Sequence, residues 1–253
     1  MPWDPAQYMK FADHRLRPAL DLLDHVPLSA PAEICDLGAG TGNVTRQIKS
    51  RWPAAHVTGV DDSEEMLARA SEAPDIDWER ADLGSWAPRA APDLIYSNAA
   101  LHWLPRHERV FPRLVSYLAP DGVLAAQMPR NFTAPSHALV DEAVRSGPWR
   151  ERLEHLIRPS PTQEPAFYYD LLAPITKTLD IWETEYLHVL SGPDPVKEWL
   201  KGSWLQQFLA ELDEPMRGEF EACYGGLVRK AYPQRSDGHT LLPFRRLFIV
   251  ATI

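Results

Sequence analysis

The sequence of 253 residues predicts an α/β protein in which helices wind around both faces of a seven-stranded, mostly parallel sheet. Three observations predict this class. Short apolar runs alternate with helical segments over the first half of the chain, a glycine-rich loop follows the first run at once, and acidic residues end the next two runs. Strands in this arrangement run parallel, because the intervening helices supply the crossover connections that parallel pairing needs.

The first half of the chain contains five of the expected strands and the helices between them. Strands are expected at 32–37, 56–61, 76–82, 93–99 and 122–128, and helices at 43–51, 63–72 and 106–118. Ser63 is expected to cap the second helix, because a serine hydroxyl can accept a hydrogen bond from an N–H of the first turn. A turn at Pro120–Gly122 precedes the fifth strand.

The pattern changes after Met128, where seven of the 24 prolines fall between Pro129 and Pro174. Helical pieces are expected at 135–146, 149–157, 194–201 and 204–231, and late strands at 177–190 and 241–253. We expect one domain, divided into an N-terminal helical cap (1–30), a ligand-binding core (31–129), helical insertions (130–240) and the final strand (241–253). The insertions should cover the carboxyl edge of the sheet, where ligands bind in such folds.

Composition narrows the classes of partner. With 26 Lys and Arg against 35 Asp and Glu, the formal net charge is −9, which disfavours a nucleic acid. No apolar run is long enough to span a membrane, and the first residues contain no apolar signal core, so we expect a cytoplasmic protein. Cys35 and Cys223 make neither a disulfide framework nor a metal site. A small-molecule ligand and a monomer or weak homo-oligomer are expected.

The glycine loop is the strongest motif. It contains Gly38, Gly40 and Gly42, follows the first strand and opens a helix. A dinucleotide loop would have its third glycine at position 43, where this chain has Asn43. Asp36 precedes the loop, and its carboxylate would repel a pyrophosphate but suits a cation. The loop therefore favours S-adenosylmethionine, which carries a sulfonium and an ammonium group.

Further polar residues fall where a nucleoside needs them. Asp61 ends the second strand, and its carboxylate can accept hydrogen bonds from both ribose hydroxyls. Asp82 is expected to end the third strand and to accept from the adenine amino group. Asp62 and Met66 should flank the ribose and adenine, and Asn98, at the end of the fourth strand, should meet the methionine moiety.

These residues resemble the class I S-adenosylmethionine-dependent methyltransferases, a superfamily with a Rossmann-like fold. Four further segments resemble one family within it, the trans-aconitate 2-methyltransferases; they lie at 3–19, 101–105, 122–129 and 243–251. The resemblance implies transfer of a methyl group to one carboxylate of trans-aconitate, a tricarboxylate, which gives a monomethyl ester. A carboxylate with a pKa of about 4 is already ionised at pH 7, so no catalytic general base is required.

The carboxylates that do not react still need partners, and arginine matches them best. Candidate arginines lie near the N-terminus, after the fifth strand and near the C-terminus: Arg15, Arg17, Arg130, Arg235, Arg245 and Arg246, of which the first three are favoured. The other candidate substrate contacts are His102, Trp103, Tyr168 and Tyr169, and Tyr8 and Phe11 are expected to cover the cofactor.

Three alternatives stay open. The chain could be a methyltransferase for a carbon, nitrogen or phenol acceptor, in which case His102 would matter as a base. It could be a nicotinamide oxidoreductase, against which Asn43 argues. It could also bind S-adenosylmethionine without catalysis and use its helical insertion as a partner surface.

Overall fold

A computed structural model of the protein describes residues 12–71 and 74–253. The chain divides into two compact units. The first, here the sheet unit, contains Arg15–Pro129, Pro161–Thr184 and Arg246–Ile253. The second, here the helical unit, contains Arg130–Ser160 and Glu185–Arg245. The predicted single domain stays a prediction.

Seven strands form one sheet, in the order β3-β2-β1-β4-β5-β7-β6. The strands are β1 (Glu33–Leu37), β2 (His56–Asp61), β3 (Asp77–Arg80), β4 (Leu94–Asn98), β5 (Val123–Pro129), β6 (Thr178–Leu190) and β7 (Thr240–Thr252). β1 to β5 pair in parallel, and β7 pairs antiparallel with β5. The predicted fold class is therefore confirmed.

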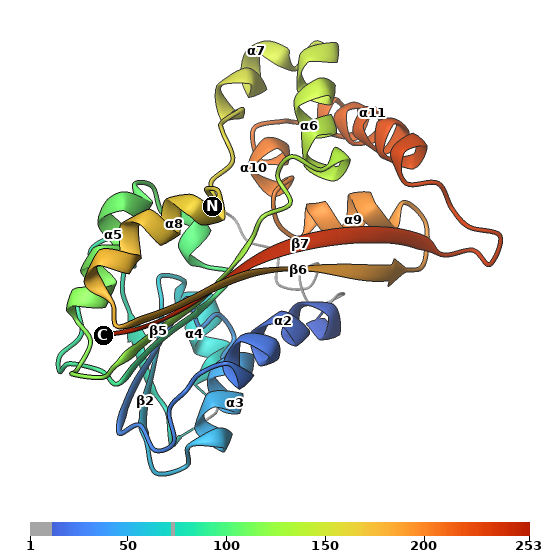
Figure 1. The fold of residues 1–253 in the computed structure, drawn as a ribbon. Coiled ribbons are helices and arrows are strands. Elements are labelled where there is room, and N and C mark those ends of the chain that lie inside the picture. Colours follow the sequence, from blue (N-terminus) through green and yellow to red (C-terminus); the bar gives the residue numbers. More distant parts are fainter. Residues whose placement is uncertain (1–11, 72–73) are drawn as a thin grey trace. The chain divides into compact units, whose positions relative to one another are not determined.

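Helices cover the faces of the sheet unit (Figure 1). They are residues 15–24 of α2 (Ala12–Asp24), α3 (Asn43–Arg51), α4 (Glu64–Ala70), α5 (His107–Ser116) and α8 (Pro165–Leu172), with short 3-10 turns η1 (Leu101–Trp103) and η3 (Ala173–Ile175). Ser63 caps α4 as predicted, because its side chain accepts from the N–H of Met66. The two helices α5 and α8 lie side by side and bury Phe111 and Tyr168 in one core with residues of β5 and β7.

The helical unit is built around a pair of helices, α6 (Pro135–Ser146) and α11 (Met216–Ala231), which run side by side in Figure 1. The remaining helices of this unit are α7 (Arg150–Leu153), η2 (Glu154–Leu156), α9 (Pro195–Lys201) and α10 (Gln206–Leu209). The pair is fastened by a buried hydrogen bond of 2.7 Å, in which the hydroxyl of Tyr224 donates to the carbonyl of Ser136.

Two expected elements differ from the structure, and one helix was not expected. The continuous helix over 204–231 is wrong, because α10 ends at Leu209 and α11 begins only at Met216. Pro215 separates them, since proline lacks an N–H and disfavours helical backbone in the residue before it. The third strand ends at Arg80 rather than at Asp82, and helix α8 in the proline-rich region was not predicted.

Over residues 12–71 and 74–253, no helix is both long enough and apolar enough to cross a bilayer.

Candidate functional site

The glycine loop joins the end of β1 to the start of α3 at the carboxyl edge of the sheet. Gly38, Gly40 and Gly42 all have positive φ, of 80°, 56° and 75°, which residues with a side chain rarely adopt. The N–H groups of Gly38 and Ala39 donate to the carbonyl of Val60, which ties the loop to β2. A Cβ on Gly40 would meet no atom within 4 Å, so the middle of the loop borders open space. The loop has the form of a cradle for a ligand.

Asp61 is held firmly beside that cradle. Its Oδ2 accepts from the N–H of Gly40 at 2.8 Å, and its Oδ1 accepts from the N–H of Ser63 at 3.0 Å. Burial raises the pKa of Asp61, and the backbone donors oppose this shift. Each carboxylate oxygen has two lone pairs, so both oxygens can still accept a hydroxyl. The geometry therefore suits the predicted contact with a ribose.

Asp36 lies near the end of β1, two residues before Gly38. Only 2% of the residue is exposed, and its Oδ2 accepts from Thr45 Oγ1 at 2.6 Å. Burial, opposed by the hydrogen bond from Thr45 and assisted by the nearby charge of Asp61, raises the pKa of Asp36 to about 7. A cationic ligand close to this carboxyl would favour its ionised form. The acidic environment thus agrees with the predicted cationic ligand, although one carboxylate oxygen already accepts a hydrogen bond from Thr45 of α3.

Four other residues are predicted to contact the cofactor, and these contacts stay predictions. Asp82 is exposed and organises a turn, since its Oδ1 accepts from the N–H of Gly84 at 2.9 Å. Asp62 is exposed, Met66 is buried on α4, and Asn43 is exposed at the first position of α3. Asp82 follows the end of β3 by two residues, which corrects its expected place within the strand.

The end of β4 supplies the next side of the site. Asn98 is the last residue of β4 as predicted, and its Oδ1 is buried with no hydrogen-bond partner among the described residues. Such an atom is costly unless a ligand or water satisfies it. Ala99 follows with a positive φ of 55°, a conformation that non-glycine residues seldom adopt. An unsatisfied acceptor at this edge fits a ligand with an ammonium group.

His102 and Trp103 lie in η1, directly after this edge. His102 is buried, and its ring centroid lies 4.6 Å from that of Trp103. The turn is anchored by His107, whose Nε2 donates to the carbonyl of Leu101 at 3.0 Å. Burial lowers the pKa of His107, which favours its neutral form. The two predicted substrate residues are therefore held in a fixed turn next to Asn98.

The two tyrosines of α8 differ from each other. Tyr168 is fully buried; its hydroxyl donates to His107 Nδ1 at 2.7 Å and accepts from the N–H of Gln163 at 3.1 Å. These contacts favour a structural role for Tyr168 within the core of the sheet unit. Tyr169 is 57% exposed. For both residues, contact with a substrate stays a prediction.

The candidate arginines also separate. The Arg17 side chain is 75% exposed and lies 4.0 Å from Asp21, one turn along α2. Arg130 is partly exposed, and its N–H donates to the carbonyl of Arg245, whose own side chain is exposed. Arg235 is exposed as well. The predictions for Tyr8 and Phe11, and for the side chain of Arg15, lie outside the described residues.

Arg246 is the exception. It is only 4% exposed, and its Nη1 donates to Oε1 of Gln127 at 3.4 Å. Sequence reasoning gave Arg246 no preference over the other arginines and did not consider Gln127. The available signal was the run GVLAAQM, in which glutamine is the only polar side chain of a buried strand.

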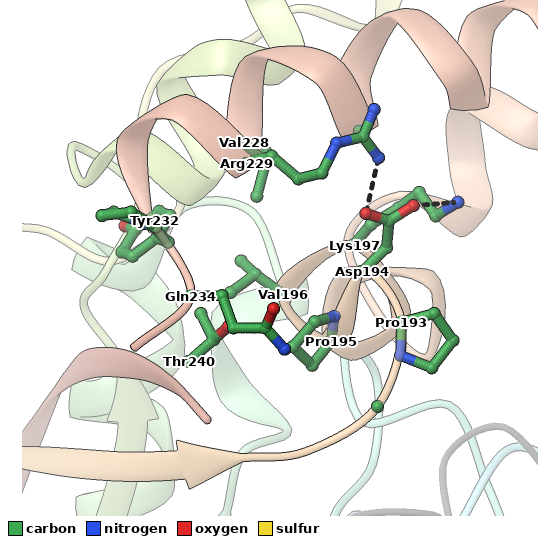
Figure 2. Close-up of a pocket in the computed structure, with 13 residues that line it drawn as sticks. Pro193, Asp194, Pro195, Val196, Lys197, Val228, Arg229, Tyr232, Gln234 and Thr240 are labelled. Atoms are coloured by element: carbon green, nitrogen blue, oxygen red, sulfur yellow. Dashed lines mark hydrogen bonds and ion pairs between the residues drawn. The ribbon is translucent and has the colours of Figure 1, made fainter. Parts of the chain in front are cut away.

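A pocket of about 470 Å³ lies in the helical unit (Figure 2). Figure 2 shows Asp194 between Lys197 and Arg229, with which it forms ion pairs. These charges satisfy one another, so the glycine-loop edge remains the candidate site. In the parts of the chain that the structure describes, no group of three or more His, Cys, Asp or Glu residues is arranged to hold a metal ion.

The chain is similar in sequence to known methyltransferases. A family model described as "Methyltransferase domain" matches residues 34–122, which include the glycine loop and Asn98. A trans-aconitate 2-methyltransferase of Azoarcus sp. (strain BH72) is 47% identical over 250 residues, which cover 98% of this chain and 98% of that protein. A protein of the same name from Streptomyces avermitilis is 45% identical and covers 98% of this chain and 96% of its own length.

Solved structures show the same fold at low identity. Phosphoethanolamine N-methyltransferase 2 of Haemonchus contortus, in complex with S-adenosyl-L-methionine, is 17% identical with a TM-score of 0.55, over 93% of this chain and 52% of its own. The YcgJ protein of Bacillus subtilis is 16% identical with a TM-score of 0.57, over 93% of this chain and 98% of its own.

Proposed function

Because the chain belongs to the trans-aconitate 2-methyltransferase family, we propose that it transfers the methyl group of S-adenosylmethionine to a carboxylate of trans-aconitate. The products are the monomethyl ester and S-adenosylhomocysteine. The similarity that supports this function extends over nearly the whole chain and is not confined to the glycine loop. The acidic cradle formed by the loop, Asp36 and Asp61 supports a cofactor that carries positive charge.

The chain offers a group for each part of the cofactor. Asp61 accepts hydrogen bonds from the ribose hydroxyls, and Asp82 accepts one from the adenine amino group. Asp62 and Met66 flank the ribose and the adenine. Asn98 Oδ1 accepts from the ammonium group of the methionine moiety, which satisfies a buried atom. Gly40 lets the backbone approach the ligand, since its surroundings are open.

The reaction needs little chemistry from the protein. Bound S-adenosylmethionine supplies an electrophilic methyl group on a positively charged sulfur. A lone pair of the acceptor carboxylate forms the new O–C bond as the S–C bond pair returns to sulfur, and no proton moves. The site contributes alignment and exclusion of water. The predicted partners of the carboxylates that do not react are Arg15, Arg17 and Arg130. The carboxylate that reacts is bordered by His102 and Trp103.

The first experiment identifies the product. The protein is incubated with S-adenosylmethionine and, separately, trans-aconitate, cis-aconitate, isocitrate and citrate, and the acids are analysed by mass spectrometry. We expect the mass of one added methyl group on trans-aconitate. No product at saturating cofactor would refute the proposed acceptor. A rate constant kcat that rises steeply with slope one between pH 6 and 8 would indicate a general base, for which His102 is the candidate.

The second experiment tests the cofactor site. Asp61→Ala should weaken binding of S-adenosylhomocysteine by about 1.5–3 kcal/mol, because charge-assisted hydrogen bonds are lost. Asp24→Ala is a suitable control, since that exposed carboxylate pairs with Arg51 on the surface. Calorimetric titration measures both. If Asp61→Ala binds S-adenosylhomocysteine with wild-type affinity, the proposed contact between Asp61 and the ribose is refuted. If NAD stabilises the protein against heat and S-adenosylhomocysteine does not, that result instead favours an oxidoreductase.

The proposal extends to partners and location. A net charge of −9 supports a small-molecule acceptor rather than a nucleic acid, because a phosphate backbone would be repelled. We infer a cytoplasmic protein that is a monomer or a weak homo-oligomer. Light scattering across a concentration series measures the mass in solution, and a stable, concentration-independent oligomer would refute the second part.

A further inference from the structure

A buried arginine, Arg246 of β7, forms a hydrogen bond with a buried glutamine, Gln127, near the carboxyl end of β5. Arg246 is 4% exposed and Gln127 is fully buried. The guanidinium Nη1 donates to Oε1 of Gln127 at 3.4 Å, although the two residues are 119 positions apart in the chain. Charged side chains are rarely buried without a specific reason. The sheet therefore brings a cation into its interior at this edge.

The strand register places this pair beside the proposed cofactor contact. Asn98 of β4 pairs with Gln127 of β5, and Pro129 of β5 pairs with Arg246 of β7. Side chains two positions apart on a strand share a face, so Gln127 and Pro129 point the same way, as do their partners. Asn98, Gln127 and Arg246 therefore line one face at the carboxyl ends of β4 and β5.

The hydrogen bond between the pair fixes what Gln127 can offer. Its oxygen is used by Arg246, so its Nε2 group is left as a donor. Nε2 is buried and finds no acceptor among the residues that the structure describes. A guanidinium and an amide N–H group on one face are donors of the kind that a carboxylate accepts in pairs.

We propose that Arg246 and Gln127 bind a carboxylate of the acceptor that does not react. This rests on the function proposed above. A guanidinium bound to the attacking oxygen would withdraw the lone pair that displacement needs, whereas one bound to a second carboxylate orients the molecule without that penalty. Asn98 lies one strand away, which places the held carboxylate next to the cofactor contact. The pair thereby selects acceptors that carry at least two carboxylates.

The test compares Arg246→Gln and Gln127→Met with Arg245→Gln, the neighbouring arginine whose side chain is exposed. Four acceptors are used: trans-aconitate and its three dicarboxylate analogues glutaconate, itaconate and mesaconate, each lacking one carboxylate. An analogue that is not methylated is measured as a competitive inhibitor. The affinity for S-adenosylhomocysteine reports whether the fold and the cofactor site are intact.

We expect Arg246→Gln to lower kcat/KM for trans-aconitate at least tenfold, mainly through KM, and Gln127→Met to lower it about fivefold or more. For the analogue that lacks the carboxylate held by Arg246 and Gln127, each of the two substitutions should change kcat/KM, or the inhibition constant if the analogue is not methylated, less than twofold. Arg245→Gln should resemble the wild type throughout. The affinity for S-adenosylhomocysteine should stay within twofold.

Equal losses for all four acceptors would mean a merely structural pair, and wild-type values would mean no contact; either result overturns the proposal. If Arg246→Gln no longer binds S-adenosylhomocysteine, Gln127→Met decides by the same criteria. A wild-type protein that does not methylate trans-aconitate would instead refute the proposed function itself, so the two failures are distinguishable.

Discussion

The two ends of the strands β1, β2 and β3 carry acidic residues in different settings. At the amino end, His56 on β2 lies between Glu33 on β1 and Asp77 on β3, with nitrogen–oxygen distances of 2.7 and 2.8 Å. All three side chains are at least 44% exposed. At the carboxyl end, Asp36 and Asp61 are partly or wholly buried, and their recorded hydrogen-bond donors are backbone N–H groups and the hydroxyl of Thr45.

This difference separates a charge-balanced arrangement from one that we propose binds a ligand. The amino end balances its charges internally and in contact with water, where an ion pair contributes little but costs little. The carboxyl end holds carboxylates by neutral donors, so its negative charge remains available to a ligand. Burial raises the pKa of both Asp36 and Asp61, and a cationic ligand nearby would favour their ionised forms. Perturbed groups of this kind gather at functional sites.

The largest expected effect comes from filling the space at Gly38. A Cβ there would lie 2.1 Å from Cβ of Ala100, in a backbone with φ of +80°. We expect Gly38→Ala to lower the free energy of unfolding by about 2–5 kcal/mol, since left-handed strain and overpacking add. Binding of S-adenosylhomocysteine should fall with it. Urea unfolding and calorimetric titration measure the two effects.

Gly238 is a matched control for this change. Its φ is +84°, but a Cβ there meets nothing within 4 Å. Gly238→Ala should therefore cost only the strain of the left-handed backbone, about 1–2 kcal/mol, and leave ligand binding unchanged. Equal losses in the two variants would mean that the close approach to Ala100 does not matter, and that the carboxyl end is less tightly built than we infer.

The carboxyl end was also the part that sequence reasoning predicted best. The loop glycines and Asp61 lie close in the chain, and the hydrogen bond from Gly40 to Asp61 spans only 21 positions. A local motif with a strand before it and a helix after it therefore sufficed. Arg246 and Gln127 are 119 positions apart, and only the antiparallel pairing of β7 with β5 brings them together. Nothing in the sequence near either residue indicates that pairing.

A similar reason explains what was missed in the second half of the chain. The strands and the helix α6 were found because their apolar patterns are regular. The short helix α8 begins at Pro165, which reads as a breaker in isolation but is favoured in the first turn of a helix. The burial of Tyr168 against His107 was also not predicted, because it depends on the packing of α8 on α5, which no local pattern shows.

The next largest effect is expected at Asp36, whose buried carboxyl should lower the free energy of unfolding when it is ionised. The folded pKa of Asp36, about 7, lies above its ordinary value of 3.8, so the folded state holds the proton more tightly. The stability that this group contributes is present below pH 4 and is lost as the pH rises to 7. Asp36→Asn should remove that loss and stabilise the ligand-free protein at pH 8 by up to about 4 kcal/mol. Urea unfolding between pH 5 and pH 8 measures the change.

The exposed Asp24 provides the control for Asp36. Asp24→Asn removes a carboxylate that pairs with Arg51 on the surface, so the slope of stability with pH should stay close to that of the wild type. Asp36→Asn should also bind S-adenosylhomocysteine more weakly, since a charge opposite the ligand's ammonium is gone. If the stability of Asp36→Asn depends on pH as steeply as that of the wild type, Asp36 is ionised at little cost. That result would weaken the contrast between the two ends of the strands.

The smallest effect is expected at the amino end. Hydrogen bonds to Glu33 and then Asp77 raise the pKa of His56 above 6.5, against a small opposing effect of burial. The stabilisation is thus fully present below pH 6.5 and is lost as the pH rises through the folded pKa. Because all three side chains are exposed, His56→Asn should cost only about 0.5–1 kcal/mol at pH 5.5 and less at pH 9. His155→Asn, at another exposed histidine, should show no such difference. If His56→Asn were as costly at pH 9 as at pH 5.5, the cluster would act through neutral hydrogen bonds, and charge balance would not distinguish the two ends.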